Sequence, residues 1–161
     1  LHSFPTRRSS DLQLATARLA KLPTVQAIKE ASGDISQIAE VLELTAADDF
    51  DVYSGNDDQT LPIIALGGKG VISVTANIAP GAMHALTAAC LAGDMAEART
   101  RMRRTNILNR AMFYENNPIP VKTAMALMGL DTGVMRLPLV PMGEANKARL
   151  TEALKAYGGL L

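Results

Sequence analysis

The sequence predicts an α/β protein made of parallel βα units and followed by a mostly helical region. Between Val25 and Thr75, three short apolar segments alternate with helical patterns, and the connections between them are short. This alternation is typical of parallel strands that are covered by helices. After Thr75 the strand pattern stops, and amphipathic patterns with helical spacing fill the rest of the chain.

The elements of the first region follow from their boundary residues. The three strands are expected over 25–31, 50–54 and 70–75, each beside a Gly- or Asp-containing turn. Asp34 is a good N-cap for the helix after the first strand, whose apolar side chains share one face. Pro23 ends an earlier helix, expected over 14–22, because it biases the preceding residue away from the α region. A short helix, 61–66, has Pro62 in its first turn and stops at Gly67-Gly68.

Four helices are expected in the second region, over 80–92, 94–114, 120–128 and 144–157. The second of them carries an arginine cluster made of Arg99, Arg101, Arg103 and Arg104. A basic cluster can bind nucleic acid, but this one has no interleaved aromatic residues and lies in a protein of zero net charge. We therefore interpret the cluster as a solvated helix face.

Composition limits the class of protein and its partners. The chain has 161 residues, 48% of them hydrophobic, which is enough for an ordinary domain core. It has 16 basic and 16 acidic residues, so no global field favours nucleic acid or an anionic membrane. No segment approaches the roughly 18 apolar residues of a membrane span. We expect a small-molecule partner, with no nucleic acid and no membrane.

The single cysteine, Cys90, cannot form an internal disulfide, which fits a reducing cytoplasm. It falls in an Ala-rich apolar stretch, so we predict a core residue rather than a nucleophile. The opening residues 1–12, LHSFPTRRSSDL, have no apolar period and resemble a translated sequencing-adapter tail. We predict that this segment is non-native and exclude it from the fold. The alternative is a disordered N-terminal extension.

Lys29 is the candidate catalytic residue. In strand alternation Val25, Ala27 and Lys29 share one face, and Lys29 stands next to the carboxyl end of its strand, where parallel α/β proteins place active sites. Burial of a lysine there would disfavour its ammonium form and free the amine to attack a carbonyl group, forming a Schiff base. From the strand pattern alone, a solvent-exposed lysine at the end of a strand is the stronger interpretation.

Five motifs change this balance. They are Val25–Asp34 (VQAIKEASGD), Tyr53–Asp57 (YSGND), Gly67–Asn77 (GGKGVISVTAN), Asn117–Ala124 (NPIPVKTA) and Arg136–Pro141 (RLPLVP). In this order and at these intervals they resemble the dihydrodipicolinate synthase family, within the N-acetylneuraminate lyase superfamily, from about Leu14 to Leu161. The resemblance implies the C-terminal part of a TIM (β/α)8 barrel, with its last three strands over residues 13–79 and an all-α extension over 80–161. A complete barrel needs roughly 250 residues.

The resemblance also implies a class I aldolase. Lys29 falls at the family's imine-forming lysine and would capture pyruvate, which then adds to an aldehyde co-substrate, L-aspartate 4-semialdehyde in the synthases. Ile72 would line the pyruvate pocket, and Gly55 would let the chain pass close to the site; their alternatives are a core isoleucine and a plain turn glycine. No metal or organic cofactor is implied, and the whole protein would be a homotetramer.

The chain departs from the family pattern because the family's N-terminal half is missing. That half carries the threonine pair, the proton-relaying tyrosines and the arginine that holds the semialdehyde carboxylate. We therefore expect an incomplete fragment that is inactive by itself. Two alternatives stay open: another pyruvate-dependent aldolase, such as an N-acetylneuraminate lyase or a 2-keto-3-deoxy sugar acid aldolase, or a non-catalytic helical interaction module.

Overall fold

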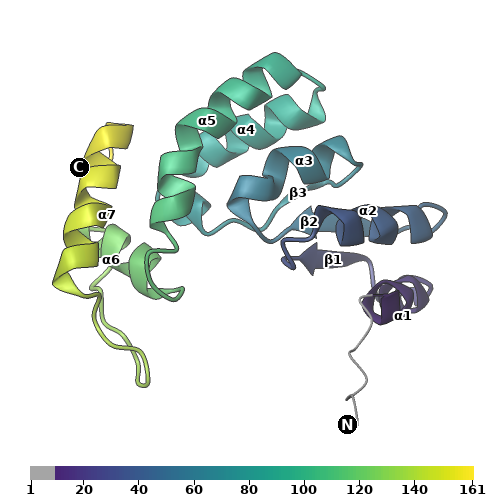
Figure 1. Ribbon diagram of the computed structural model, residues 1–161, viewed down its shortest axis with the longest axis horizontal. Coiled ribbons are helices and arrows are strands. Elements are labelled where there is room, and N and C mark those ends of the chain that lie inside the picture. The colour runs from purple at the N-terminus through teal and green to yellow at the C-terminus, as the bar shows by residue number, and fades with distance from the viewer. Residues whose placement is uncertain (1–9) are drawn as a thin grey trace, which may run out of the picture. The chain divides into compact units, whose positions relative to one another are not determined.

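The computed structural model describes residues 10–161 and divides into two compact units between Ile72 and Ser73. The first unit holds the strands, and the second is helical (Figure 1). This division lies seven residues before the boundary predicted after residue 79, which stays a prediction. Of the segment predicted to be non-native, residues 1–9 lie outside the described residues.

The first unit is built on a three-stranded parallel sheet. Its strands are β1 (Ala27–Glu30), β2 (Asp51–Ser54) and β3 (Gly70–Val71), in the order β1-β2-β3. Both strand pairs are parallel, with Lys29 opposite Tyr53 and Tyr53 opposite Gly70. The predicted succession of parallel βα units is therefore confirmed.

Over residues 10–72 the unit has three α-helices, of which the second and third pack on one face of the sheet and the first packs against the second (Figure 1). They are α1 (Ser10–Ala20), α2 (Ile35–Leu44) and α3 (Thr60–Ala65), with a 3₁₀ helix η1 (Asp57–Gln59) leading into α3. The core combines Ile38 and Val41 of α2, Val52 of β2 and Ile63 of α3. Because side chains alternate along a strand, the residues on either side of Val52 face away from these helices.

Asp34 begins α2 as predicted. Its carboxylate accepts hydrogen bonds from the backbone N–H groups of Ser36, at 2.9 Å, and Gln37, at 3.1 Å. These two donors have no partner within the first turn of a helix, so the side chain satisfies them in place of water. The first turn of α2, which directly follows the Lys29 strand and its turn, is thereby fixed.

The second unit consists of four helices after a 3₁₀ helix η2 (Thr75–Asn77). They are α4 (Pro80–Leu91), α5 (Met95–Ala111), α6 (Ile119–Leu127) and α7 (Glu144–Tyr157). Leu108, Met112, Ala124, Leu150 and Leu154, all fully buried, form the centre of its core. The expected all-α extension is confirmed, and the bounds of the four helices differ from the predicted ones by no more than a few residues.

Two elements differ more clearly from their predicted extent. Strand β3 ends at Val71, although Val and Thr residues continue to position 75. There the Ser73 hydroxyl accepts a hydrogen bond from Ala76 N–H at 2.8 Å and turns the chain into η2. Helix α1 starts at Ser10 rather than Leu14 and therefore includes the last three residues of the segment predicted to be non-native.

A buried polar pair fixes η2 inside the helical unit. The Thr75 hydroxyl donates to Asn109 Oδ1 of α5 at 2.9 Å, and both side chains are nearly inaccessible to solvent. Cys90 of α4 is also buried, which confirms the predicted core position, and burial raises the pKa of its thiol. In the arginine cluster of α5, Arg101 pairs with Glu97 at 2.6 Å and Arg104 lies over the ring of Tyr157.

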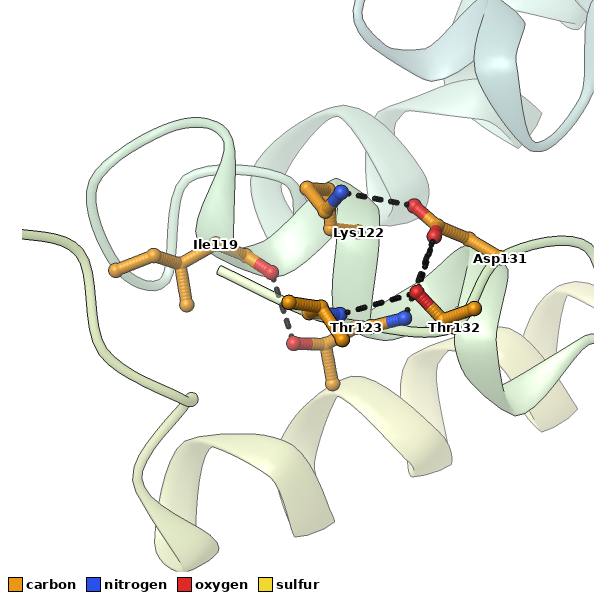
Figure 2. Close-up of polar contacts among 7 residues, drawn as sticks. Ile119, Lys122, Thr123, Asp131 and Thr132 are labelled. Carbon is orange, nitrogen blue, oxygen red and sulfur yellow. Dashed lines mark hydrogen bonds and ion pairs between the residues drawn. The ribbon is translucent and has the colours of Figure 1, made fainter. Parts of the chain in front are cut away.

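The segment between α6 and α7 is fastened to α6 by an ion pair. Lys122 Nζ lies 3.1 Å from Asp131 Oδ2 (Figure 2). Asp131 Oδ1 also accepts a hydrogen bond from Gly133 N–H. The hydrogen bond from Lys122 lowers the pKa of the Asp131 carboxyl. The same segment exposes apolar side chains, most of all Leu137, with an exposed fraction of 88%.

Candidate active site

Lys29 is the next-to-last residue of β1 and lies on the face of the sheet that the helices leave open. Its neighbour Ile28 packs against the core formed with α2 and α3, so alternation directs Lys29 to the opposite side. Lys29 itself is exposed, whereas Val52, which faces the helices from β2, has an exposed fraction of 1%. The position predicted for Lys29, at the carboxyl end of the strand, agrees with the structure.

Gly55 lies directly beside Lys29. It follows β2, and its N–H donates to Glu30 O at 2.7 Å, which extends the pairing of β1 with β2 by one residue. A Cβ atom at Gly55 would stand 2.9 Å from Lys29 Cε and 2.6 Å from Ala31 Cβ. The absent side chain is therefore what allows the loop after β2 to approach the lysine.

Ile72 extends the same face at β3. Its N–H donates to Ser54 O at 2.8 Å, and by the register of the sheet it stands opposite Gly55. Ile72 has an exposed fraction of 50%. Gly55 thus lies between the Lys29 strand and Ile72. Lys29 and Ile72 are separated by two strand spacings across the sheet and two residues along it, about 12 Å in all. The register therefore gathers all three predicted site residues on one face of one unit.

Side chains outside the predicted set hold the loops at this edge. Glu30, buried on the helix side, accepts a hydrogen bond from Ser32 N–H at 2.6 Å. Gln59, at the end of η1, donates from Nε2 to the carbonyl oxygen of Gly33 at 2.9 Å. No local sequence pattern indicates the contact of Gln59, because its partner is a backbone oxygen 26 positions away.

Tyr53 is a further neighbour of Lys29 on the open face. The two residues are opposite each other in the register of β1 and β2, and the Tyr53 hydroxyl donates to Asp51 Oδ2 at 3.4 Å. The alternation of side chains along a strand indicates this position, because Asp51, Tyr53 and Gly55 are spaced by two residues and so share one face. The family motif gives Tyr53 no catalytic role.

Within residues 10–161, no cluster of three or more His, Cys, Asp or Glu side chains could hold a metal ion. None of the described helices combines the length and the apolar character that crossing a membrane requires.

The fold and the site define a class of protein: parallel βα units of the TIM-barrel type with a lysine at the carboxyl edge of the sheet, followed by a helical extension. A profile of the dihydrodipicolinate synthetase family matches residues 1–157, a span that includes the segment predicted to be non-native. The chain belongs to this family. The family resemblance inferred from the five motifs is confirmed.

Individual relatives agree with the family match. The chain is 49% identical over 160 residues to a 4-hydroxy-tetrahydrodipicolinate synthase of Thermoanaerobacter sp. (strain X514). The alignment covers 98% of this chain and 54% of that protein. The crystal structure of dihydrodipicolinate synthase from Thermotoga maritima aligns with a TM-score of 0.89 and 44% identity, over 93% of this chain and 52% of that one.

A third comparison includes a ligand. The chloride-inhibited dihydrodipicolinate synthase from Acinetobacter baumannii, solved in complex with pyruvate, aligns with a TM-score of 0.86 and 41% identity. The alignment covers 91% of this chain and 50% of that one. The chain thus spans about half the length of the relatives that it matches.

Proposed function

We propose that this chain provides the Schiff-base lysine of a class I aldolase that condenses pyruvate with L-aspartate 4-semialdehyde. The product would be 4-hydroxytetrahydrodipicolinate, on the route to diaminopimelate and lysine. The observation that carries the proposal is the position of Lys29, on the open face of a parallel sheet and against Gly55, in a chain of the dihydrodipicolinate synthetase family.

The proposed chemistry uses the lysine as its own electron sink. Lys29 Nζ attacks the keto carbon of pyruvate, and loss of water leaves an imine. The imine withdraws electrons from the neighbouring methyl group, which loses a proton and becomes an enamine. The enamine carbon then forms a bond to the aldehyde carbon of the co-substrate, whose oxygen takes up a proton. Later attack of an amine on the imine carbon would release Lys29.

The geometry supports roles for the two other site residues. Gly55 leaves the space beside the Lys29 side chain free of a Cβ atom, so an adduct on Nζ can lie along the loop. Ile72 offers an apolar wall on the same face, exposed at the edge where the adduct would form. We propose both as pyruvate-binding residues.

Several wider assignments belong to the same proposal. We propose a cytoplasmic enzyme whose whole form is a homotetramer, and we propose that residues 1–12 are non-native. No metal or organic cofactor enters the reaction as proposed. An N-acetylneuraminate lyase or a 2-keto-3-deoxy sugar acid aldolase would use the same imine with another aldehyde, and a helical interaction module would use none of it.

Trapping with borohydride tests the central claim. The chain is incubated with pyruvate and sodium borohydride, and peptide mapping measures the adduct on each lysine. Lys29 should be labelled faster than Lys69, which is also exposed in the first unit and is the matched control. The adduct at that site should disappear in Lys29→Arg. Equal labelling of Lys29 and Lys69 would contradict the proposal and favour the non-catalytic alternative.

We propose further that turnover needs the other half of the relatives' length. General acid–base catalysis typically contributes about 10²- to 10⁴-fold, and the family resemblance assigns the proton-relaying tyrosines to that half. The chain and its Thermoanaerobacter relative should be assayed together with pyruvate and aspartate semialdehyde. Turnover by the chain within tenfold of the relative would refute this dependence, and a preference for a sugar aldehyde would favour another aldolase.

A further inference from the structure

Two loops meet at the edge of the sheet that carries Lys29. The first, from Ala31 to Asp34, joins β1 to α2 and contains Gly33, whose φ of +80° is a left-handed conformation that favours glycine. The second follows β2 and continues into η1, which ends at Gln59. The first loop begins two residues after Lys29, so its position affects the lysine directly.

A hydrogen-bonded chain of two amides links these loops. Asn56 Nδ2 donates to Gln59 Oε1 at 3.2 Å, and Gln59 Nε2 donates to Gly33 O at 2.9 Å. Asn56 is itself held by Ser54, whose hydroxyl donates to Asn56 O at 2.7 Å. The link therefore runs from the end of β2 to the turn after β1.

The chemistry of this link requires an amide at position 59. The amide oxygen of Gln59 accepts the hydrogen bond from Asn56, and its amide nitrogen donates the one to Gly33 O, so the side chain must act as acceptor and donor at once. A glutamate of the same length can still accept from Asn56, but its carboxylate cannot donate to Gly33 O. Substitution by glutamate therefore removes one hydrogen bond while it preserves the size of the side chain.

The hydrogen bond from Gln59 to Gly33 lies next to the close approach of Gly55 to the Lys29 strand. Gly55 is the first residue of the second loop, and a Cβ atom there would meet both Ala31 and Lys29. If the first loop moved away from the second, the contact between Gly55 and the Lys29 side chain would open. A bond from Gln59 to Gly33 resists this movement from the opposite end of the first loop.

We infer that Gln59 is a positioning residue, which holds the loop after Lys29 against Gly55 and so restricts where Lys29 can place its amine. The inference rests on the proposed function of Lys29 as the imine-forming lysine. The side-chain hydrogen bonds of Gln59 go to Asn56 and Gly33, so it acts on Lys29 through Gly33. The bond is exposed to water, so its effect should be no larger than that of one ordinary hydrogen bond.

The test compares Gln59→Ala and Gln59→Glu with the parent chain. Both variants should slow pyruvate trapping at Lys29 by about threefold to tenfold, as expected for one hydrogen bond, without a change at Lys69. Amide hydrogen exchange in residues 31–34 should become faster in both. Gln37→Ala, a similar substitution in α2, is the matched control, and it should leave both measurements unchanged.

The possible outcomes separate this inference from the function on which it rests. If Gln59→Glu behaves like the parent, donation to Gly33 does not matter and the inference is overturned. It is also overturned if neither variant changes trapping or exchange. If the parent shows no preference for Lys29, the proposed function fails, whereas faster exchange in both variants would still support the link between the loops.

Discussion

Replacing Gly55 by alanine should damage the first unit and its site together. The new Cβ would stand 2.6 Å from Ala31 Cβ, 2.9 Å from Lys29 Cε and 3.1 Å from Glu30 O. The lysine can bend away, but the Glu30 carbonyl is part of the backbone and Ala31 Cβ is attached directly to it, so neither can move without the backbone. The strand end itself must therefore shift.

The magnitude follows from two opposing effects. Overpacking of this kind costs about 1–3 kcal/mol, and the reduced freedom of the unfolded chain returns about 0.4–1 kcal/mol. We expect the free energy of unfolding to fall by about 1–2 kcal/mol. For a unit of this size this corresponds to a decrease in Tm of about 5–15 °C. Trapping of pyruvate at Lys29 should fall as well, because the shift displaces the lysine.

Two other glycines make this prediction specific. Gly68→Ala meets Ile63 Cγ2 at 2.7 Å and Ile63 O at 2.9 Å, so it should lower stability without changing the reactivity of Lys29 in the folded protein. Gly81 has open space around it, and Gly81→Ala should lower neither quantity. Circular dichroism during urea and thermal unfolding gives stability, and borohydride trapping gives reactivity. A Gly55→Ala chain as stable and as reactive as the parent would refute the packing argument.

Three further predictions concern polar contacts. The stabilisation from the pair of Asp131 and Lys122 should be present above the unfolded carboxyl pKa of about 3.9 and be lost as the pH falls through the lower folded pKa. In urea unfolding, the free energies of unfolding of Asp131→Asn and the parent should therefore converge in acid. A difference between them that stays constant with pH would be contrary evidence. Asp34→Ala should cost about 1 kcal/mol of unfolding free energy and Asp34→Asn much less, with equal losses arguing against capping. Thr75→Val should lower the free energy of unfolding by about 1–3 kcal/mol, because it leaves Asn109 Oδ1 buried without this donor. A decrease below about 0.5 kcal/mol in urea unfolding, roughly the smallest expected for one hydrogen bond, would contradict that reason.

Local signals predicted most of the fold. The N-cap at Asp34 and the start of α7 at Glu144 follow from residues adjacent in sequence, and both agree with the structure. The face occupied by Lys29 followed from strand alternation, which depends only on neighbouring residues. These features could be predicted because the interactions that cause them lie within one element.

Features that depend on distant partners could not be predicted. Val74 and Thr75 have strand propensity, yet the chain turns after Val71, and Thr75 bonds to a side chain 34 positions away. The contact between Gln59 and Gly33 spans 26 positions and involves a backbone oxygen, which any residue could supply. The identity of a residue does not indicate such a partner.

The separation of the site residues along the chain determines when the site forms during folding. Gly55 is 26 positions from Lys29 and Ile72 is 17 positions from Gly55, so each contact closes one βα unit and none requires the helical unit. Each parallel pairing must close a βα crossover before its contacts form, so this step costs chain entropy and is slower than helix formation. The pairing of β1 with β2 brings Gly55 to Lys29 in the same step, because the hydrogen bond from Gly55 to Glu30 belongs to that pairing. The surroundings of the lysine should therefore form when the sheet forms and be lost when it unfolds.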